Sequence, residues 1–342
     1  MTQWSDELGA PDHETRPIFV GGCSRSGTTL LAAMLGSSPD VVTVPEAEFK
    51  WDAFKDGTTF DGRVQLGSMV DFLSQDPKFA YWGVPLPSLT AAERRQLISL
   101  GSLLSLLAAA YARSVDKPAA TVWVDHTPAN IRHICTLADV CPDARFVHIV
   151  RDGRAVAASV MPLDFGPNTP AEAADYWSSQ VAMGLAAADR LGDDRVATVR
   201  FEDLLQRPRE ALTALCGRLD LTFHENMIHQ RDYRVQSYTA KQHALVSQPP
   251  DPRRAVAWRT ALSSRQVEIF EARTGELLRY LDYPMEFGIS ARDLRKAEHI
   301  ASATRSALRR VTTDRLRRYV RRRRPVGADA SIVGNNGNRA TA

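Results

Sequence analysis

The sequence is poor in cysteine and contains no long hydrophobic run. Four cysteines occur in 342 residues, too few and too irregularly spaced for a disulfide framework, and no two have zinc-ligand spacing, so we expect reduced thiols. Serines and a glycine interrupt the longest apolar stretch, residues 97–112, which therefore predicts a buried helix rather than a membrane span. Residues 1–16 are polar and lack the apolar segment of a secretion signal. These absences favour a cytoplasmic globular protein.

The net charge of +3 hides an uneven distribution along the chain. Residues 1–290 carry 29 Lys and Arg against 36 Asp and Glu, whereas residues 291–342 carry 14 against 4. We expect this C-terminal basic tail to be solvated, partly helical over residues 294–319 and then disordered. Contact between its helix and an anionic membrane surface is the alternative. No interleaving of aromatic residues with these arginines supports nucleic-acid binding.

Short apolar runs alternate with helical stretches through the body of the chain, about residues 17–290. Five runs are typical of strands: residues 17–21, 41–44, 121–125, 145–150 and 195–201. Helical stretches follow at residues 27–35, 129–140, 154–161 and 203–219, the last interrupted at Pro208. This alternation predicts an α/β fold with a mainly parallel sheet flanked by helices on both faces. Residues 48–117 break the rhythm, and we expect a helical substrate-side insertion over the active-site edge. Ser263 and Gln266 form the capping-box pattern of a last helix that ends near Leu281.

A glycine-rich turn, residues 21–30, joins the first predicted strand to the first predicted helix. In such a turn the backbone N–H groups and the positive end of the helix dipole bind an anion. Gly27 allows the backbone to approach the ligand closely, and Thr28 and Thr29 add hydroxyl donors. Arg25 supplies a fixed positive charge. The turn therefore predicts an anion site, with a ligand-free glycine turn as the alternative.

The same turn departs from the P-loop of nucleotide hydrolases at one position. Gly22 and Gly27 have the P-loop spacing, but Thr28 stands where the P-loop has lysine, and the positive charge lies upstream at Arg25. The segment Arg25-Ser26-Gly27-Thr28-Thr29-Leu30-Leu31 resembles the 5′-phosphosulfate loop of sulfotransferases that use 3′-phosphoadenosine 5′-phosphosulfate (PAPS), most closely in the tyrosylprotein and bacterial branches. The resemblance implies a P-loop-type fold. It assigns to the phosphosulfate group the residues Arg25, Ser26, Gly27, Thr28 and Thr29.

A second motif for an anion lies about 125 residues further along the chain, in residues 146–159. Arg151 ends a predicted strand and Ser159 follows eight residues later, two turns into a helix, so that both can converge on one phosphate. In the sulfotransferases that the sequence resembles, the matching pair binds the 3′-phosphate of PAPS. A salt bridge between Arg151 and Asp152 is the alternative, but it explains neither Ser159 nor the first motif.

Two later segments resemble nucleotide-binding parts of the same family. Residues 199–204 match a segment whose aromatic side chain lies near the adenine, which implies Phe201 as a wall of the base pocket. A phenylalanine that only fills the core is an equal alternative. Residues 253–259 resemble, more loosely, a basic segment with a tryptophan that closes over the nucleotide. From this resemblance we assign Arg254 to the nucleotide, although Arg253 fits the pattern as well.

Sulfuryl transfer requires an acceptor oxygen in line, a group that takes its proton, and positive charge near the leaving phosphate. Arg25 is the expected charge stabiliser. Glu46 follows the second predicted strand, where the resemblance places the catalytic glutamate of the tyrosylprotein branch, and it accepts the proton if burial raises its pKa. His126 is the competing base, or a charged partner of the sulfuryl oxygens where many relatives have lysine. Because Glu48 replaces a basic residue of the tyrosylprotein branch, a peptide acceptor is in doubt.

The sequence thus predicts an enzyme that moves a sulfuryl group from PAPS to a hydroxyl or amine and releases 3′-phosphoadenosine 5′-phosphate (PAP). We expect no metal, since fixed cations replace Mg²⁺ and no carboxylate cluster demands one. A hydroxylated small molecule, a carbohydrate, a glycolipid and a peptide tyrosine all remain as acceptors. Loops within residues 48–117 and 165–168 are expected to select among them. The alternatives are a P-loop kinase-like phosphotransferase, which Thr28 disfavours, and a non-catalytic nucleotide-binding protein.

Overall fold

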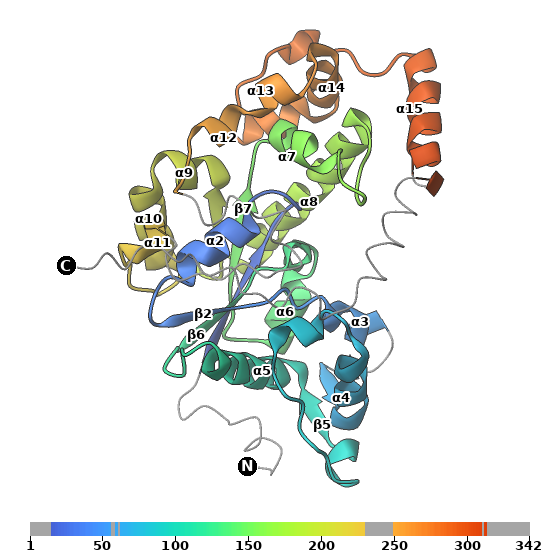
Figure 1. Ribbon diagram of the computed structural model, residues 1–342. Coiled ribbons are helices and arrows are strands. Elements are labelled where there is room, and N and C mark those ends of the chain that lie inside the picture. The colour runs from blue at the N-terminus through green and yellow to red at the C-terminus, as the bar shows by residue number, and fades with distance from the viewer. Residues whose placement is uncertain (1–14, 56–58, 61, 230–248, 310, 313–342) are drawn as a thin grey trace, which may run out of the picture.

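A five-stranded parallel β-sheet forms the centre of the computed structural model, which describes residues 15–55, 59–60, 62–229, 249–309 and 311–312 (Figure 1). The strand order is β2-β6-β1-β7-β8. The strands are β1 (Arg16–Gly21), β2 (Val41–Val44), β6 (Val122–Asp125), β7 (Arg145–Val150) and β8 (Val196–Arg200). All neighbouring pairs in this sheet are parallel. The predicted α/β fold with a parallel sheet is confirmed, and each predicted strand is correct to within one residue at each end.

Helices cover both faces of this sheet. They are α2 (Thr28–Leu35), α5 (Leu100–Ser114), α6 (Ile134–Val140), α7 (Gly153–Val160), α8 (Pro170–Leu191), α9 (Phe201–Gln206), α10 (Pro208–Arg218), α11 (Asn226–His229), α12 (Arg253–Val256), α13 (Trp258–Ala261) and α14 (Ser264–Tyr280). The predicted capping box of Ser263 and Gln266 is present at the start of α14. Helix α8 was not among the predicted elements, although Thr169 and Pro170 form a helix-start signal.

Alternate strand residues pack against helices on opposite faces of the sheet. On one face, Ile18 and Val20 of β1 join a core with side chains of α2, α9 and α10. On the other face, Phe19 packs between Trp123 and Phe146, with ring centroids 5.4 and 5.8 Å away. Since both faces are buried, the strands are apolar throughout, which is the pattern that indicated a parallel sheet.

The helix predicted over residues 129–140 is in fact two pieces. A 3₁₀ helix, η3 (Pro128–Arg132), precedes α6, and the two are separated by His133. The side chain of Asn130 in η3 donates to the carbonyl oxygens of Val20 at 3.1 Å and Asp125 at 3.2 Å. These bonds hold η3 against the ends of β1 and β6, so the chain cannot continue as one straight helix.

Residues 48–117, where we expect an insertion, contain mainly helices in their described part. This range contains α3 (Phe49–Lys55), α4 (Leu66–Gln75), η1 (Phe79–Trp82), η2 (Glu93–Arg95) and all of α5. It also contains a three-stranded antiparallel sheet that was not predicted, made of β3 (Thr59–Phe60), β4 (Arg63–Gln65) and β5 (Leu97–Ser99). Strands of two or three residues are too short to show a period in the sequence. The predicted helix over residues 97–112 accordingly begins only after β5.

The basic tail is helical over α15 (Lys296–Arg309). The hydroxyl of Ser306 donates to Glu172 Oε1 at 2.8 Å, and Arg309 donates to the carbonyl oxygens of Met161 and Leu163 at 2.7 and 2.8 Å. Most described side chains of α15 are exposed, as expected for a solvated, partly helical tail, but the helix is also anchored. Ser306 binds α8, and Arg309 binds the segment between α7 and α8. The remainder of the predicted helix, residues 313–319, and the disorder predicted after it lie outside the described residues.

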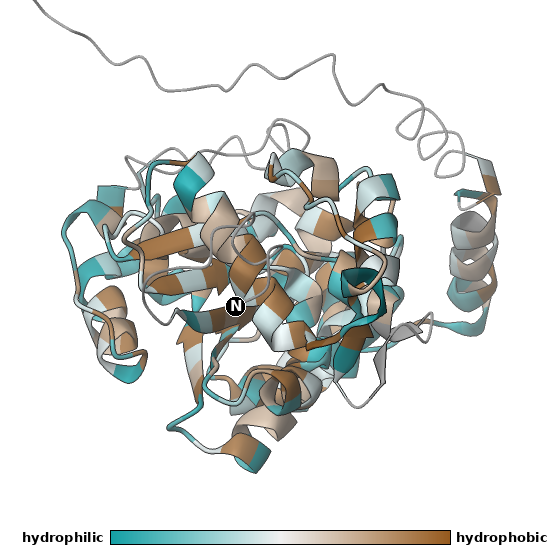
Figure 2. Ribbon diagram, turned by 90° about the horizontal axis from the view of Figure 1, so that it is seen from below, coloured by the Kyte–Doolittle hydropathy of each residue, from teal (hydrophilic) through white to brown (hydrophobic). Residues whose placement is uncertain are grey.

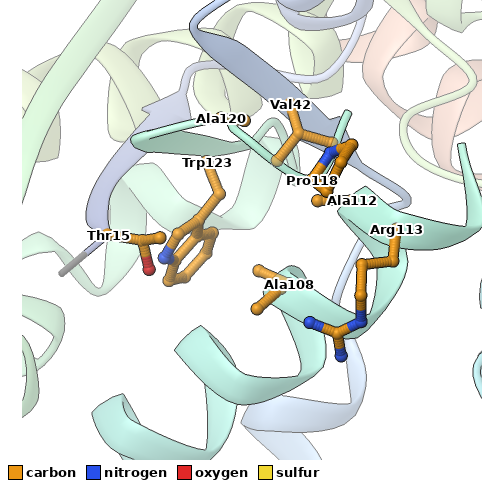
Figure 3. Close-up of a pocket in the computed structure, with 9 residues that line it drawn as sticks. Thr15, Val42, Ala108, Ala112, Arg113, Pro118, Ala120 and Trp123 are labelled. Atoms are coloured by element: carbon orange, nitrogen blue, oxygen red, sulfur yellow. The ribbon is translucent and has the colours of Figure 1, made fainter. Parts of the chain in front are cut away.

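The structure also contains a small surface hollow away from the predicted site residues. The hollow, near the amino ends of β2 and β6, is lined mainly by apolar side chains, among them Val42, Ala108 and Trp123 (Figure 3). It lies at the opposite edge of the sheet from the predicted site residues. Within the described part of the chain, no helix is both long enough and apolar enough to cross a membrane.

Candidate functional site

The carboxyl edge of the five-stranded sheet collects most of the predicted site residues. Parallel strands end at the same edge of a sheet, and ligands of open α/β sheets bind there. One predicted residue follows each strand: Glu46 after β2, His126 after β6, Arg25 after β1, Arg151 after β7 and Phe201 after β8. In the strand order, both base candidates lie on one side of Arg25, and the second arginine and the aromatic ring lie on the other.

The glycine-rich turn between β1 and α2 contains left-handed backbone. Gly27 has a φ of +101° and Arg25 a φ of +75°, a region that side chains other than glycine seldom occupy. A Cβ atom on Gly27 would lie 2.4 Å from the ring of Phe201. The turn and the ring therefore fit together only with glycine at this position.

The first turn of α2 has the features of an anion site. Ser26, Thr28 and Thr29 are all buried there, and the helix has no acidic residue in its first turn. The buried hydroxyl oxygen of Ser26 has no hydrogen-bond partner among the described residues. A buried hydroxyl without a partner is costly, and a bound oxyanion would satisfy it.

The two predicted anion motifs meet at this turn. Arg25 Nε donates to Ser159 Oγ at 3.1 Å, and Arg151 Nη1 donates to the carbonyl oxygen of Arg25 at 2.8 Å. The Arg151 guanidinium lies over the ring of Phe201, 4.3 Å from its centroid. Its buried Nε has no hydrogen-bond partner in the described part of the chain. The structure therefore brings together four predicted residues from three separate segments.

Asp152, the alternative partner for Arg151, belongs to a different buried network. Its carboxylate pairs with Arg154 at 2.8 Å and accepts from the Arg154 N–H as the N-cap of α7. Arg154 also pairs with Glu271 of α14 at 2.6 Å. This network fixes α7, the helix that carries the serine of the second motif, against α14.

Burial makes the two site guanidinium charges unfavourable. Desolvation lowers the pKa of Arg25 and of Arg151, and the positive charge of Arg25 lowers the pKa of Arg151 further. The carboxylates of Glu46 and Glu202 act in the opposite direction. Both guanidinium groups stay protonated at neutral pH. The edge of the sheet thus holds two adjacent, partly desolvated positive charges, which an oxyanion would stabilise.

Glu46 has the raised pKa that a general base at neutral pH requires. Burial and then the negative charge of Asp125 raise its pKa to about 7, while the positive charges of Lys78, Lys50 and Arg25 act in the opposite direction. A group that titrates near the working pH is both sufficiently deprotonated and sufficiently basic to accept a proton. Burial thus raises the pKa of Glu46, which is the condition for this carboxylate to accept a proton from the acceptor.

His126 is buried and uncharged at neutral pH. Burial lowers its pKa to about 4, although the charge of Asp125 and a hydrogen bond to the backbone of Val44 act in the opposite direction. Its Nδ1 is buried and has no hydrogen-bond partner among the described residues. A charged role beside the sulfuryl oxygens is therefore disfavoured, and a role as neutral base remains.

A buried ion pair that the sequence did not reveal lies next to both base candidates. Lys50 of α3 pairs with Asp125 at the end of β6, and neither side chain is exposed to more than 1%. Asp125 also accepts from the Thr127 N–H at 2.9 Å, and the Thr127 hydroxyl oxygen accepts from the Ala47 N–H at 2.9 Å. This network ties the segment after β2 to the segment after β6 and so positions Glu46. Sequence spacing gives no signal for a pair 75 residues apart.

The late basic segment places its two arginines differently. Arg253 pairs with Asp251 and its side chain is 90% exposed, whereas Arg254 on α12 is half-buried. Trp258, which the resemblance placed over the nucleotide, is buried with its ring 4.1 Å from the Arg154 guanidinium. Arg254 is thus the better placed of the two arginines for a ligand, and Trp258 belongs to the core between α7 and α14.

Comparison with known proteins agrees with the geometry of this edge. The model of the Sulfotransferase family matches residues 17–225, more than half of the chain. The chain belongs to the sulfotransferase family. Sulfotransferase domains of known structure share its fold. The domain of the Synechococcus PCC 7002 olefin synthase gives a TM-score of 0.54 at 23% identity and covers 83% of this chain and 100% of that chain. The domain from the curacin biosynthetic pathway gives 0.54 at 17% identity, covering 80% and 99%.

Two curated proteins align with this chain over more residues than the family model does. The protein-tyrosine sulfotransferase of Drosophila melanogaster is 23% identical over 245 residues, which are 68% of this chain and 44% of that protein. Nodulation protein NoeE of Sinorhizobium fredii is 26% identical over 294 residues, 78% of this chain and 65% of that protein. The chain spans about half the length of the curated relatives that it matches first. The resemblance drawn from the sequence is confirmed at the level of the family.

Proposed function

We propose that this sulfotransferase transfers a sulfuryl group from PAPS to a hydroxyl or amine of an acceptor and releases PAP. The contact between its two anion motifs is the observation that supports this proposal most directly. Arg25 donates to Ser159 at 3.1 Å, and Arg151 donates to the Arg25 carbonyl oxygen at 2.8 Å. Two buried arginines from different strand ends suit a nucleotide with two separate phosphate groups.

The residues present fit PAPS as a ligand. The Ser26 hydroxyl and the Arg151 Nε are buried without partners among the described residues, so both are available to phosphate oxygens. On this proposal the 3′-phosphate is held by Arg151 and Ser159, and the adenosine by Phe201 and Arg254. The phosphosulfate is held by the turn after β1, through Arg25, Ser26, Gly27, Thr28 and Thr29.

The chemistry follows from the positions of Glu46 and Arg25. When bound, PAPS supplies an activated sulfuryl group, whose bond to the phosphate oxygen breaks as a bond to the acceptor oxygen forms. Glu46 takes the proton of the acceptor hydroxyl, because a pKa of about 7 leaves it partly ionised at neutral pH. Arg25 and the N–H groups at the start of α2 stabilise the charge left on the phosphate oxygen. The arginines supply the positive charge, so the proposal includes no metal ion.

The acceptor is proposed to bind over β2 and β6. Glu46 and His126 follow these two strands, whereas the residues assigned to the nucleotide follow β1, β7 and β8. Glu48 forms a salt bridge with Lys78, whereas the tyrosylprotein branch has a basic residue near this position. We therefore favour a hydroxylated small molecule, a carbohydrate or a glycolipid over a peptide tyrosine.

A nucleotide titration and a transfer assay test this proposal. At equal concentrations PAP should raise the melting temperature more than ATP does, because only PAP carries a 3′-phosphate for Arg151. A larger shift with ATP would favour a phosphotransferase. Incubation of the protein with labelled PAPS and a cell extract, followed by mass spectrometry, should yield a sulfated acceptor. Binding of PAP without any transfer would support the non-catalytic alternative instead.

A further inference from the structure

Helix α15 (Lys296–Arg309) presents apolar residues to solvent and polar residues to the protein. A surface helix ordinarily does the reverse. Ile300 and Leu308 are 70% and 63% exposed and Val311 is 65% exposed, whereas Ser306 is 3% exposed. At 3.6 residues per turn, positions 300 and 308 fall within about 80° of one another around the helix, and so share one face. Val311 follows two residues after the end of the helix. We call these three exposed side chains the apolar stripe.

Polar contacts at both ends hold α15 in this orientation. Near the start of the helix, Glu298 pairs with Arg265 at 2.6 Å. Near its end, Ser306 donates to Glu172, and Arg309 donates to two carbonyl oxygens of the segment after α7. The apolar stripe thus faces outward because the opposite side of the helix is anchored. Figure 2 shows α15 at the margin of the molecule, with brown apolar stretches among teal polar ones.

The sequence around the apolar stripe is strongly basic. Residues 305–324 contain ten arginines and a single acidic residue, Asp314. A second copy of the chain would bring the same positive charge to the stripe, so charge repulsion opposes a dimer through this face. An anionic lipid bilayer combines the two properties that match it, negative charge at the headgroups and an apolar interior.

We propose that α15 forms a docking surface for an anionic lipid bilayer, to which the basic sequence of residues 305–324 adds positive charge. The apolar stripe inserts at the boundary between headgroups and acyl chains, and the arginines bind the headgroups. Because α15 is anchored to the segment between α7 and α8, docking would bring residues 165–168, an expected acceptor loop, close to the lipid surface. This proposal is independent of the nucleotide that the site binds.

Vesicle flotation of the full-length protein tests this proposal. The protein should float with vesicles that contain phosphatidylglycerol, more weakly at high salt, and should not float with phosphatidylcholine alone. The triple variant Ile300→Ser, Leu308→Ser, Val311→Ser should partition about a hundredfold more weakly, because its apolar contribution is removed. Its melting temperature should be unchanged, since these side chains are exposed. Leu97→Ser with Met183→Ser, which removes two apolar side chains that are 53% and 47% exposed elsewhere, should bind like the parent.

Three results would overturn the proposal. The parent protein does not bind the anionic vesicles, or the triple variant binds them as tightly as the parent, or the parent is a dimer that the triple variant converts to a monomer. The last result would show that a second copy covers the stripe. PAP binding measured on the same samples keeps a failure here distinct from a failure of the nucleotide site.

Discussion

Burial and the negative charge of Asp125 raise the pKa of the Glu46 carboxyl to about 7, whereas a solvated glutamate has a pKa of about 4.3. The folded protein therefore keeps a proton that the unfolded chain has already released. As the pH rises through this window, the ionised carboxylate destabilises the folded state. An unfavourable buried charge of this kind is typical of functional sites, where a reactive group is kept in spite of its cost to stability.

The substitution Glu46→Gln should separate catalysis from stability. The amide keeps the size of the side chain but cannot take a proton, so kcat should fall by about 10²–10⁴-fold with PAP affinity nearly unchanged. The melting temperature above pH 7 should rise, because no buried charge forms. His126→Ala, assayed with the same acceptor and pH, should lose less activity. An inactive His126→Ala beside a nearly normal Glu46→Gln would assign the base to His126.

The pH dependence of kcat/KM for the acceptor is a second, independent test of whether Glu46 or His126 is the base. If Glu46 is the base, log kcat/KM should rise with unit slope below about pH 7 and level off above it, because only the carboxylate accepts the proton. The lowered pKa of His126, about 4, predicts a different curve. A profile that stays flat between about pH 5 and 8 would identify the histidine, which is already neutral over that range.

At the level of the elements, the ion pair of Lys50 and Asp125 joins α3 to the end of β6. Lys50→Met would leave the Asp125 carboxylate buried without its cation, and we expect a loss of about 3–5 kcal/mol in the free energy of unfolding. Lys78→Met is the matched control, because Lys78 pairs with Glu48 while both side chains are more than 40% exposed. It should cost at most about 1 kcal/mol. Urea unfolding of both variants measures the difference, and equal losses would refute a special role for the buried pair.

The elements that the sequence predicted best are those with a strong local signal. The five strands of the main sheet are buried on both faces and bounded by turns, so their apolar runs mark them clearly. Strands β3, β4 and β5 are two or three residues long and carry no comparable pattern. The break at His133 depends on bonds from Asn130 to two other strand ends, which no local window contains.

The residues of the candidate site also fall into those that could be predicted from the sequence and those that could not. Residues that follow strands, such as Arg25 and Arg151, were predictable because parallel strands bring their carboxyl ends to one edge. The contact between Arg25 and Ser159 agrees with that prediction. The pair of Lys50 and Asp125 was not predictable, because it depends on how the insertion packs against β6.

At the scale of the whole molecule, buried histidines predict sensitivity to acid. His148 lies in β7, and both of its ring nitrogens are buried without hydrogen-bond partners among the described residues. Burial lowers the pKa of His148 and of His126 to about 4. As the pH falls from about 6.5 to 4, these two side chains therefore bind protons in the unfolded chain but not in the folded protein. Their contribution should lower the free energy of unfolding as the pH falls.

The ring of His148 packs directly against Gly184 of α8. The substitution His148→Phe should reduce this acid sensitivity, since it keeps an aromatic ring at that position that takes up no proton. The melting temperature, followed from pH 8 to about 4, should decline less steeply in this variant. The exposed His229→Phe is the control and should follow the parent curve. If the melting temperature declines equally in the parent and both variants, the buried histidine is not the cause of the loss of stability at acid pH.

Across the whole sheet edge, the central claim is that two anion motifs form one nucleotide site. Calorimetry of Arg151→Ala with PAP and with adenosine 5′-phosphate, which lacks the 3′-phosphate, tests it most directly. Loss of a desolvated guanidinium contact should weaken PAP binding by about 2–5 kcal/mol and leave the affinity for adenosine 5′-phosphate nearly unchanged. Unchanged PAP affinity would contradict the two-motif site. Equal losses for both ligands would contradict a direct phosphate contact, and would mean that Arg151 acts only through its bond to the Arg25 carbonyl oxygen.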